Sequence, residues 1–218
     1  MKERPILFTG AMVLALLDGS KTQTRRIYKN RKHPDAGCDM AASELVREAQ
    51  HVIHRSCPYG QPGDRLWVRE TFRKVMGQTA GWIATDYRAT YQHGDRLGDV
   101  VGMAGKWTPS IHMPRDASRI QLEIIDVRVE RLQEISEADC IAEGIEPNWI
   151  GPLDKGPNGT GTEGWLGDEW RHYGHSVEGD PAYSALESYR SLWESINGAG
   201  SWDANPWVWV VDFRRTCQ

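Results

Sequence analysis

Residues 19–26 read Gly-Ser-Lys-Thr-Gln-Thr-Arg-Arg, and this stretch brings an amine, several hydroxyls and two guanidinium groups together in a short space. Apolar residues recur at helical spacing just before it, at positions 12, 13, 16 and 17. Gly19 stands where a glycine in the left-handed conformation commonly ends a helix. We therefore expect a helix that stops at Gly19, followed by a turn that carries Lys21.

The second half of this stretch alternates like a β-strand. Thr22, Thr24 and Arg26 share one phase of the two-residue period, so Thr24 and Arg26 are expected on the same face of a strand over 22–27. The amine of Lys21 would then come close to a strand hydroxyl. The alternative interpretation is a solvated basic turn, because charge clusters usually face water.

The composition is that of an ordinary globular protein. With 218 residues, 39% of them hydrophobic and 26% charged, the chain is long enough for one substantial core, and we expect a single domain over 1–218. No apolar run reaches the length of a membrane helix, and the first four residues lack the apolar segment of a signal peptide. The sequence therefore predicts a cytoplasmic protein with no membrane partner.

The net charge and the aromatic content indicate which classes of ligand the protein could bind. The formal net charge of −4 argues against a broad nucleic-acid surface, which normally carries an excess of Lys and Arg. The ten tryptophans exceed what a core of this size needs, and aromatic faces are the usual platform for stacked nucleobases. These two features favour a small ligand or a local RNA contact, and nothing indicates an obligatory protein partner.

The sequence contains only weak signs of a metal site and no motif for a nucleotide cofactor. His51, His54 and Cys57 recur every third residue, with Cys38 as a fourth candidate zinc ligand, but this spacing fits no standard zinc finger and also arises when a helix presents one face. The four cysteines are scattered without a CxxC pair, which argues against disulfides. The chain has no GxGxxG or Walker-type loop, no GxSxG elbow and no HExxH motif. We therefore expect neither a metal nor a cofactor.

The remaining periodicity predicts a small mixed sheet with helices between its strands. Strands are expected over 4–8, 22–27, 66–69, 119–132 and 207–213, and helices near 41–54 and 182–196. A phase slip at Ile125 and Asp126 predicts a β-bulge in the longest strand. The almost continuously apolar run 207–213 predicts a central strand. This mixture favours a curved sheet or barrel over a doubly wound fold.

A short helix after the long strand places a carboxylate in an unusual position. Ser136 and Asp139 form a capping box that opens this helix, and Gly144 closes it, so Glu143 lies in its last turn. The helix dipole disfavours a carboxylate there unless a cation lies close to it.

Four segments in this order resemble the ASCH superfamily. They are residues 19–26, the GDRLWV run at 63–68, the ISEADCIAEGI run at 135–145 and the final Trp-Val strand. The resemblance implies an α+β fold of the PUA-like type, a small mixed β-barrel with flanking helices. In particular, the chain looks like a long, phage-type relative of the small bacterial ASCH enzymes that act as N4-acetylcytidine amidohydrolases. Relative to those enzymes it has three surface insertions, near 28–61, 73–115 and 146–180.

The resemblance also implies the catalytic residues, because the family's Gly-x-Lys-Thr-x-Thr-x-Arg motif and its short helix map onto Lys21, Thr24 and Glu143. These residues would hydrolyse the acyl group from the exocyclic N4 of N4-acetylcytidine and related N4-acylated cytosine nucleosides without a metal. In one scheme Thr24 attacks or orients a water, with Lys21 as the base. In the other, a charged Lys21 stabilises the oxyanion while Glu143 activates water. Arg25 departs from the family pattern, which usually has an apolar residue there.

The pocket is expected to read the pyrimidine by stacking and by hydrogen bonds to its edge. Candidate substrate-binding residues are Arg26, Trp67, Trp107, His112 and Arg115, although each of them could instead serve only in packing. Because large insertions surround a small barrel, we also expect the pocket to accept acyl groups bulkier than acetyl.

Two other functions fit the sequence. PUA-like domains include RNA-binding and RNA-processing modules without amidase activity, and a local basic face would serve that role. Its candidate residues are Arg25, Arg26, Lys29, Arg31 and Lys32. The other alternative is a phage accessory or structural protein without catalysis, in which Lys21 and Glu143 would not approach each other.

Overall fold

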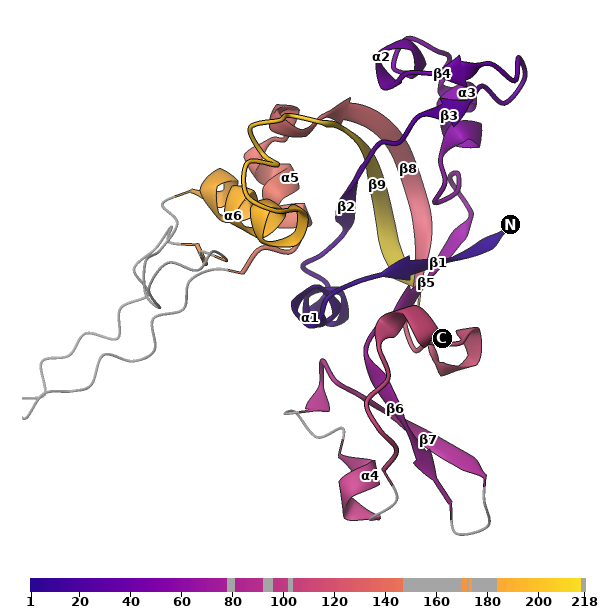
Figure 1. Cartoon of the computed structure of the whole chain (residues 1–218), viewed down its shortest axis with the longest axis vertical. Helices are drawn as coiled ribbons and strands as arrows, with labels where there is room; N and C mark the ends of the chain where they lie inside the picture. The colour runs from indigo at the N-terminus through magenta and orange to yellow at the C-terminus, as the bar shows by residue number, and fades with distance from the viewer. Residues whose placement is uncertain are drawn as a thin grey trace, which may run out of the picture.

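A computed structural model describes residues 1–77, 81–91, 96–101, 104–146, 170–171, 173 and 184–216 of the chain. In this part the protein is a mixed α+β fold built on a five-stranded sheet with the strand order β1-β5-β8-β9-β2 (Figure 1). The strands are β1 (Glu3–Leu7), β2 (Gln23–Ile27), β5 (Arg65–Arg69), β8 (Gln121–Arg131) and β9 (Trp207–Thr216). β1 runs parallel to β5, and the other neighbours are antiparallel.

The long strands β8 and β9 form the centre of the sheet and bend strongly along their length (Figure 1). Their register shifts between Ile124 and Asp126, which confirms the β-bulge that the phase slip predicts. β9 is paired on both sides, as its apolar sequence predicts. Alternate side chains of β9 enter two different cores, with Trp209 and Val211 in one and Val208 and Val210 in the other.

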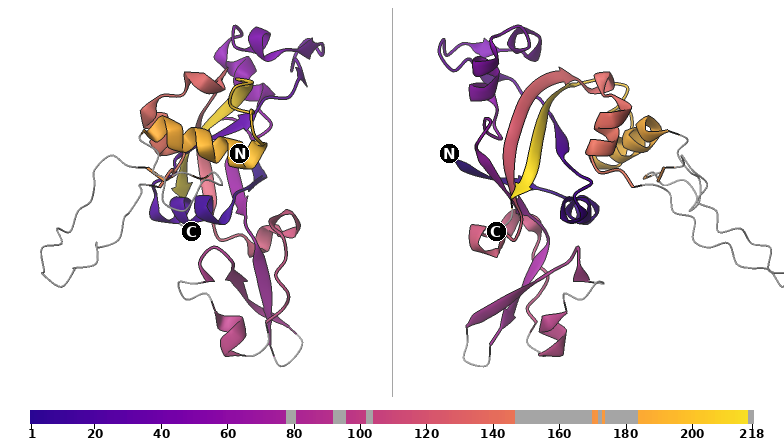
Figure 2. Two further views of the ribbon diagram at one scale, coloured as in Figure 1. Left: turned by 60° about the vertical axis from the view of Figure 1, so that its left-hand side comes forward. Right: turned by 180° about the vertical axis from the view of Figure 1, so that it is seen from behind.

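The described strands form an open, curved sheet and not the closed barrel that we expected. Its two edges are β1 and β2, and no strand pairing joins them within the described residues. Helix α1 (Gly10–Asp18) connects these edge strands and packs Val13 and Leu16 into the core. Side chains of a helix therefore take the place that barrel closure by backbone hydrogen bonds would have occupied. Figure 2 shows the curvature of the sheet from two further directions.

Two helices pack against one face of the sheet, on the side of the second core. Helix α5 (Glu137–Ala142) begins at Ser136, whose hydroxyl accepts a hydrogen bond from the backbone N–H of Asp139, as the capping box predicts. Helix α6 (Ala185–Asn197) lies beside α5 in all views (Figures 1 and 2) and buries Tyr189, Leu192 and Trp193. No helix of the described part is both long enough and apolar enough to cross a membrane.

Two of the three expected insertions form small units at opposite ends of the molecule (Figure 1). The first contains β3 (Arg31–Lys32), β4 (Asp39–Met40), α2 (Ala42–Leu45) and α3 (Gln50–Ser56). The single helix expected over 41–54 is therefore two short helices, because Ala49 adopts an extended conformation between them. The second unit contains β6 (Phe72–Met76), β7 (Trp82–Tyr87), α4 (Leu97–Val100) and 3-10 turns at Ser110–His112 and Arg115–Ala117. The insertion expected near 146–180 lies almost wholly outside the described residues.

Candidate active site

A pocket of about 300 Å³ lies between β2, the end of α5 and helix α6. A volume of this size is at the lower end of the range of small-molecule sites. The residues that line it are Met12, Thr24, Arg25, Arg26, Ile27, Lys29, Tyr59, Glu143, Tyr189, Leu192, Trp193, Ile196 and Asn197.

The turn after α1 carries Lys21 to this site. Helix α1 ends at Gly19, whose φ of 89° is in the left-handed region, so the predicted helix end is confirmed. The backbone N–H of Lys21 then donates to the carbonyl of Ala15 at 3.0 Å, and that of Thr22 donates to the carbonyl of Ala142 at 2.8 Å. These two hydrogen bonds tie the turn to both α1 and α5.

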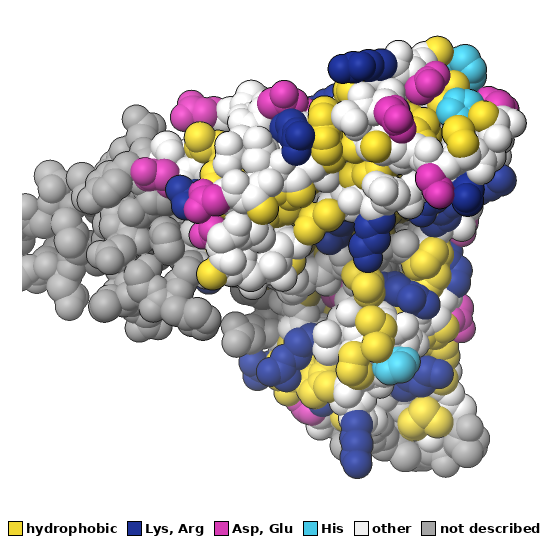
Figure 3. Space-filling model, turned by 45° about the horizontal axis from the view of Figure 1, so that its top comes forward, with side chains coloured by type: hydrophobic (Ala, Val, Ile, Leu, Met, Phe, Trp, Pro, Cys, Tyr) yellow, Lys and Arg dark blue, Asp and Glu magenta, His cyan; other side chains and the backbone are white. Residues whose placement is uncertain are grey.

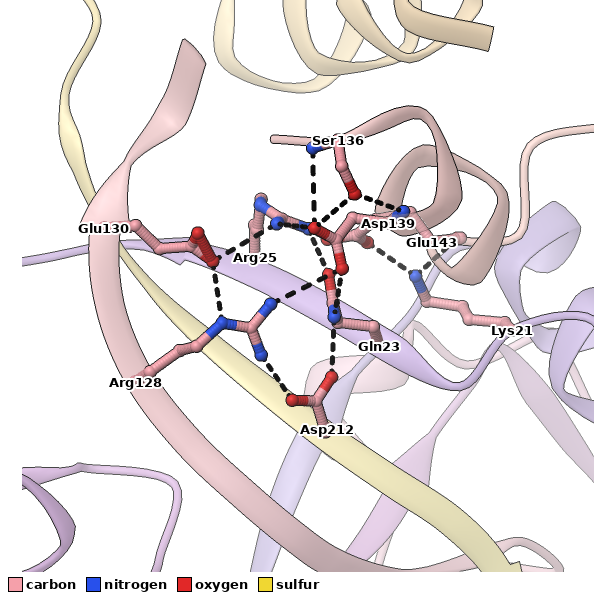
Figure 4. Close-up of polar contacts among 9 residues, drawn as sticks. All are labelled: Lys21, Gln23, Arg25, Arg128, Glu130, Ser136, Asp139, Glu143 and Asp212. Carbon is pink, nitrogen blue, oxygen red and sulfur yellow. Dashed lines mark hydrogen bonds and ion pairs between the residues drawn. The ribbon is translucent and has the colours of Figure 1, made fainter. Parts of the chain in front are cut away.

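Lys21 donates two hydrogen bonds to Glu143 (Figure 4). Its Nζ lies 2.6 Å from the backbone carbonyl oxygen and 2.8 Å from Oε2 of the carboxylate. Both side chains are buried, with 0% and 3% of their surface exposed. The amine therefore contacts both the carbonyl oxygen and the carboxylate of Glu143 at the C-terminal end of α5. The helix dipole disfavours an isolated carboxylate at that end. Lys21 supplies the cation that the position of Glu143 requires.

Gly144 makes this close approach possible. Its φ of 80° is in the region that favours glycine. A Cβ atom at this position would lie 2.8 Å from Cβ of Lys21 and 2.9 Å from Cβ of Ala15. The sequence identifies Gly144 as a helix end, but only the structure shows that it also packs directly against the lysine.

Arg25 lies on the other side of Glu143 and is also fully buried. Its guanidinium is 3.5 Å from Glu143, 3.4 Å from Glu130 and 3.4 Å from Asp139. It also donates a hydrogen bond to the side-chain oxygen of Gln23 (Figure 4). A buried arginine is tolerated when carboxylates surround it in this way. This network accounts for the burial of a charged residue where the family resemblance leads one to expect an apolar one.

The network continues towards solvent through Arg128 (Figure 4). Arg128 forms ion pairs with Glu130 at 2.9 Å, with Asp139 at 3.4 Å and with Asp212. Burial opposes the ionisation of Asp139, yet hydrogen bonds from Gln23 and Ser136 hold the pKa of its carboxyl below the ordinary value. Asp139 is therefore an anion that helps to keep Arg25 in place.

The environment of Lys21 lowers the pKa of its amine. Burial lowers the pKa of Lys21 below its ordinary value, and the nearby Glu143 carboxylate counteracts this effect only in part. Arg26 and Arg25 lower the pKa further through repulsion between like charges. A lysine that acts as a general base near neutral pH needs a shift in this direction.

Thr24 and Arg26 both line the pocket, as their shared strand phase predicts. They pair with Val211 and Trp209 of β9, two positions apart, so they occupy the same face of β2. The hydroxyl of Thr24 forms no hydrogen bond with any residue that the structure describes. Arg26 donates to the carbonyl oxygen of Leu7 at 2.7 Å, which fixes its guanidinium at the rim of the site.

Four other candidate binding residues lie outside this pocket, namely Trp67, Trp107, His112 and Arg115. Trp67 is buried in β5, where its ring lies 4.8 Å from the guanidinium of Arg69. The other three belong to the segment 107–115, which a β-bridge between Thr108 and Phe72 attaches to the β6–β7 hairpin. The expectation that they share a pocket with Lys21 is corrected, because this segment follows the hairpin and not β2 (Figure 1).

The basic residues of the RNA-binding alternative lie in different environments. Arg25 is buried among carboxylates, and Lys32 pairs with Asp39 at 3.1 Å. Arg26 and Lys29 line the pocket instead. On the face drawn in Figure 3, Lys and Arg side chains occur in separate groups among acidic and apolar ones.

The candidate zinc ligands are not gathered into a site. Cys57 is buried, and burial raises the pKa of its thiol to about 11. His54 lies 3.4 Å from Asp126, across the bulge of β8. Among the residues that the structure describes, no three His, Cys, Asp or Glu side chains are grouped so that they could hold a metal ion.

Helix α6 contributes pocket residues that the sequence did not identify as binding residues. Tyr189, Leu192 and Trp193 line the pocket, whereas their helical spacing predicts only a buried face. Within the described structure, two buried N–H groups of lining residues have no hydrogen-bond partner, Nε of Arg25 and Nε1 of Trp193. Buried donors are normally satisfied, so these two are exceptions among the lining residues.

Comparison with known protein families, with curated proteins and with solved structures finds none that matches this chain. The chemistry of the pocket residues therefore carries the functional assignment.

Proposed function

We propose that the protein is a metal-independent amidohydrolase that removes the acyl group from the exocyclic N4 of N4-acetylcytidine and related N4-acylated cytosine nucleosides. The catalytic residues in this proposal are Lys21, Thr24 and Glu143. The observation that carries it is the buried Lys21 amine, hydrogen-bonded to Glu143, which lines the pocket together with Thr24. An ASCH-type, PUA-like assignment for the curved sheet belongs to the same proposal.

Hydrolysis of this amide needs a nucleophile, proton transfers and stabilisation of an oxyanion. In the favoured scheme, Lys21 accepts a proton as Thr24 or a water that Thr24 orients attacks the acyl carbon. The bond between the acyl carbon and N4 then breaks, and N4 receives a proton from Glu143 or Lys21. Where Thr24 itself attacks, water then hydrolyses the acyl–Thr24 ester and restores the hydroxyl; where water attacks, the acid forms directly. In both cases one water is consumed, and the products are a carboxylic acid and cytidine. The lowered pKa of Lys21 supports this scheme.

A second scheme uses the same three residues with different charges. If Lys21 keeps its proton, its ammonium stabilises the oxyanion while the Glu143 carboxylate activates water. The pyrimidine ring delocalises electron density from the departing nitrogen in either case, so modest acid catalysis suffices. The pH dependence of activity distinguishes the two schemes, as discussed below.

The pocket walls suit a pyrimidine nucleoside. Tyr189, Leu192 and Ile196 provide apolar and aromatic surface, and small-molecule sites combine such walls with a few polar groups. Thr24, Arg26 and Asn197 supply the polar groups of the lining that can form hydrogen bonds with the edge of a cytosine.

The test is to incubate the purified protein with N4-acetylcytidine, with and without EDTA, and to follow the release of cytidine. Lys21→Ala and Glu143→Ala are assayed beside it, and circular dichroism checks that both variants fold. We expect release that survives EDTA and falls by at least about a hundredfold in both variants. Inactivity of the wild type towards this nucleoside and towards bulkier N4-acyl analogues would overturn the proposal.

A further inference from the structure

A second cleft, of about 450 Å³, lies beside the start of α1. Gly10 lines this cleft, whereas Met12 of the same helix lines the candidate active site. The two hollows therefore adjoin the same turn of α1. The other residues that matter in the second cleft are Arg88, Tyr91 and Arg96, from the unit that contains the β6–β7 hairpin.

Aromatic rings and arginines alternate at this cleft. Tyr91 and Trp107 meet edge to face, with ring centroids 5.4 Å apart. The guanidinium of Arg88 lies 5.3 Å from the ring of Trp107, and that of Arg96 lies 5.1 Å from the ring of Tyr91. Arg88, Tyr91 and Arg96 line the hollow, and Trp107 contacts two of them without lining it; we call the hollow the arginine–aromatic cleft. Stacking on rings holds the guanidinium groups in place. Nε of Arg96 also donates a hydrogen bond to the carbonyl oxygen of Tyr91 at 3.1 Å, so its terminal N–H groups are the ones that a ligand would meet.

Neither of these two arginines forms an ion pair within the described structure, and the only described carboxylate whose pKa Arg96 helps to lower is that of Asp99. Arg73, which lies between the two rings, is paired with Asp86 at 2.8 Å and with Asp99 at 2.9 Å. By contrast, Arg88 and Arg96 are exposed, and no carboxylate of a described residue lies within ion-pair distance of either.

Glu70 also lines the cleft, but its carboxylate does not pair with Arg88 or Arg96. It is almost fully buried and forms an ion pair with Arg119 at 2.9 Å. The cleft therefore offers two positive, exposed and pre-oriented guanidinium groups beside two aromatic rings.

This chemistry fits a nucleotide. A guanidinium binds phosphate oxygens through pairs of N–H groups, and the exposed planes of arginine side chains stack on nucleobases as aromatic rings do. A local site of this kind is also compatible with a net charge of −4, because it needs only a few phosphate contacts.

We propose that the arginine–aromatic cleft binds a nucleotide that neighbours an acylated cytidine in single-stranded RNA, while the cytidine itself occupies the pocket beside Lys21. The substrate class of the site then includes RNA strands as well as free nucleosides. This inference rests on the proposed function for the identity of the base in the pocket, but the binding of RNA to the cleft does not depend on hydrolysis.

The binding test uses fluorescence anisotropy with a labelled single-stranded RNA octamer that carries an unmodified central cytidine. We expect the double variant Arg88→Ala/Arg96→Ala to bind at least about tenfold more weakly than the wild type. The slope of log affinity against log salt should fall by about 1.4 in magnitude, because two phosphate contacts with a single strand are lost. Both substituted residues are exposed, so the double variant is expected to fold.

The matched control is Arg47→Ala, an exposed arginine in the turn between α2 and α3 at the other end of the molecule (Figure 1). Its affinity for the octamer should equal that of the wild type. Equal affinity of the double variant and the wild type would overturn the proposal, and so would a wild type that does not bind the octamer.

A turnover experiment separates this inference from the proposed function. It compares acyl release from free N4-acetylcytidine with release from the same octamer carrying a central N4-acetylcytidine. We expect the double variant to lose at least about tenfold in kcat/KM on the octamer and to retain turnover of the free nucleoside. If the wild type hydrolyses neither compound but its RNA binding needs the two arginines, the proposed function fails and the RNA site stands. If the wild type hydrolyses the nucleoside and the double variant binds and hydrolyses the octamer as the wild type does, the proposed function stands and the RNA site fails.

Discussion

Lys21 and Glu143 are separated by 122 positions in the chain, and the Nζ of one lies 2.8 Å from Oε2 of the other in a buried site. The pair joins the turn after α1 to the end of α5, and Glu143 lines the candidate active site. Taking two charges out of water is costly, and the attraction between them offsets this cost only when both are present. The pair is therefore expected to influence stability as well as catalysis.

The first prediction concerns the free energy of unfolding. Glu143→Gln should destabilise the protein by about 3 kcal/mol, because it leaves the buried amine of Lys21 without its carboxylate. The double variant Lys21→Met/Glu143→Gln should lose clearly less than the sum of its two single variants, because neither charge is then left unpaired. Urea unfolding of the four proteins measures both quantities, and strict additivity would show that the two side chains do not interact.

The second prediction is the contribution of Lys21 to the pH dependence of stability. Its pKa is lowered in the folded state, so between that value and 10.5 the unfolded chain binds more protons than the folded one. Stability due to this residue should therefore rise with pH across that window, with the full penalty of a buried ammonium present below it. Unfolding free energies of the wild type and Lys21→Met test this. The difference between them should shift in favour of the wild type as the pH rises, and a constant difference would contradict the prediction.

The third prediction assigns the base. If Lys21 is the base, kcat/KM for N4-acetylcytidine should rise with pH, with an apparent pKa below 10.5 that belongs to the coupled pair with Glu143. If the ammonium of Lys21 stabilises the oxyanion, activity should instead fall across the same range as the proton is lost. We expect the rise, and a pH profile measured on the free nucleoside decides between the two schemes.

The fourth prediction separates the role of Thr24 in chemistry from its role in packing. Its hydroxyl has no hydrogen-bond partner among the described residues, so Thr24→Val should change the free energy of unfolding by less than about 1 kcal/mol. The same variant should lower kcat by about 10²- to 10⁴-fold, because the hydroxyl attacks or orients water. Thr24→Ser keeps the hydroxyl and should retain most of the activity. Full activity in Thr24→Val would remove this residue from the mechanism.

Features set by neighbours in the chain could be predicted from the sequence. The helix end at Gly19, the capping box at Ser136 and the bulge after Ile124 depend on local backbone preferences, and the structure confirms all three. The closed barrel could not be predicted in the same way. Whether the edge strands β1 and β2 pair depends on how α1 packs between them, which is a property of the whole fold.

The residues of α6 that line the pocket could not be predicted from the sequence either. The spacing of Tyr189 and Trp193 predicts that they are buried, but it does not indicate which part of the sheet α6 covers. Trp107 differs from these two residues, because the composition of its loop does suggest a binding role. The composition does not indicate which pocket the loop lies beside. Trp107 packs beside the second cleft and not beside Lys21.

The fifth prediction tests the close packing of Gly144 against Lys21. Gly144→Ala should cost about 1 kcal/mol for the left-handed conformation alone, and more because the new Cβ would meet Lys21 and Ala15. Since the contact displaces Lys21 relative to Glu143, kcat should fall by about tenfold or more while KM changes little. The matched control is Gly37→Ala, which has a φ of 70° but no atom within 4 Å of the added Cβ. Gly37→Ala should therefore show only the conformational cost, measured by urea unfolding, with full activity. Equal effects of the two substitutions on kcat would mean that the contact with Lys21 has no catalytic importance.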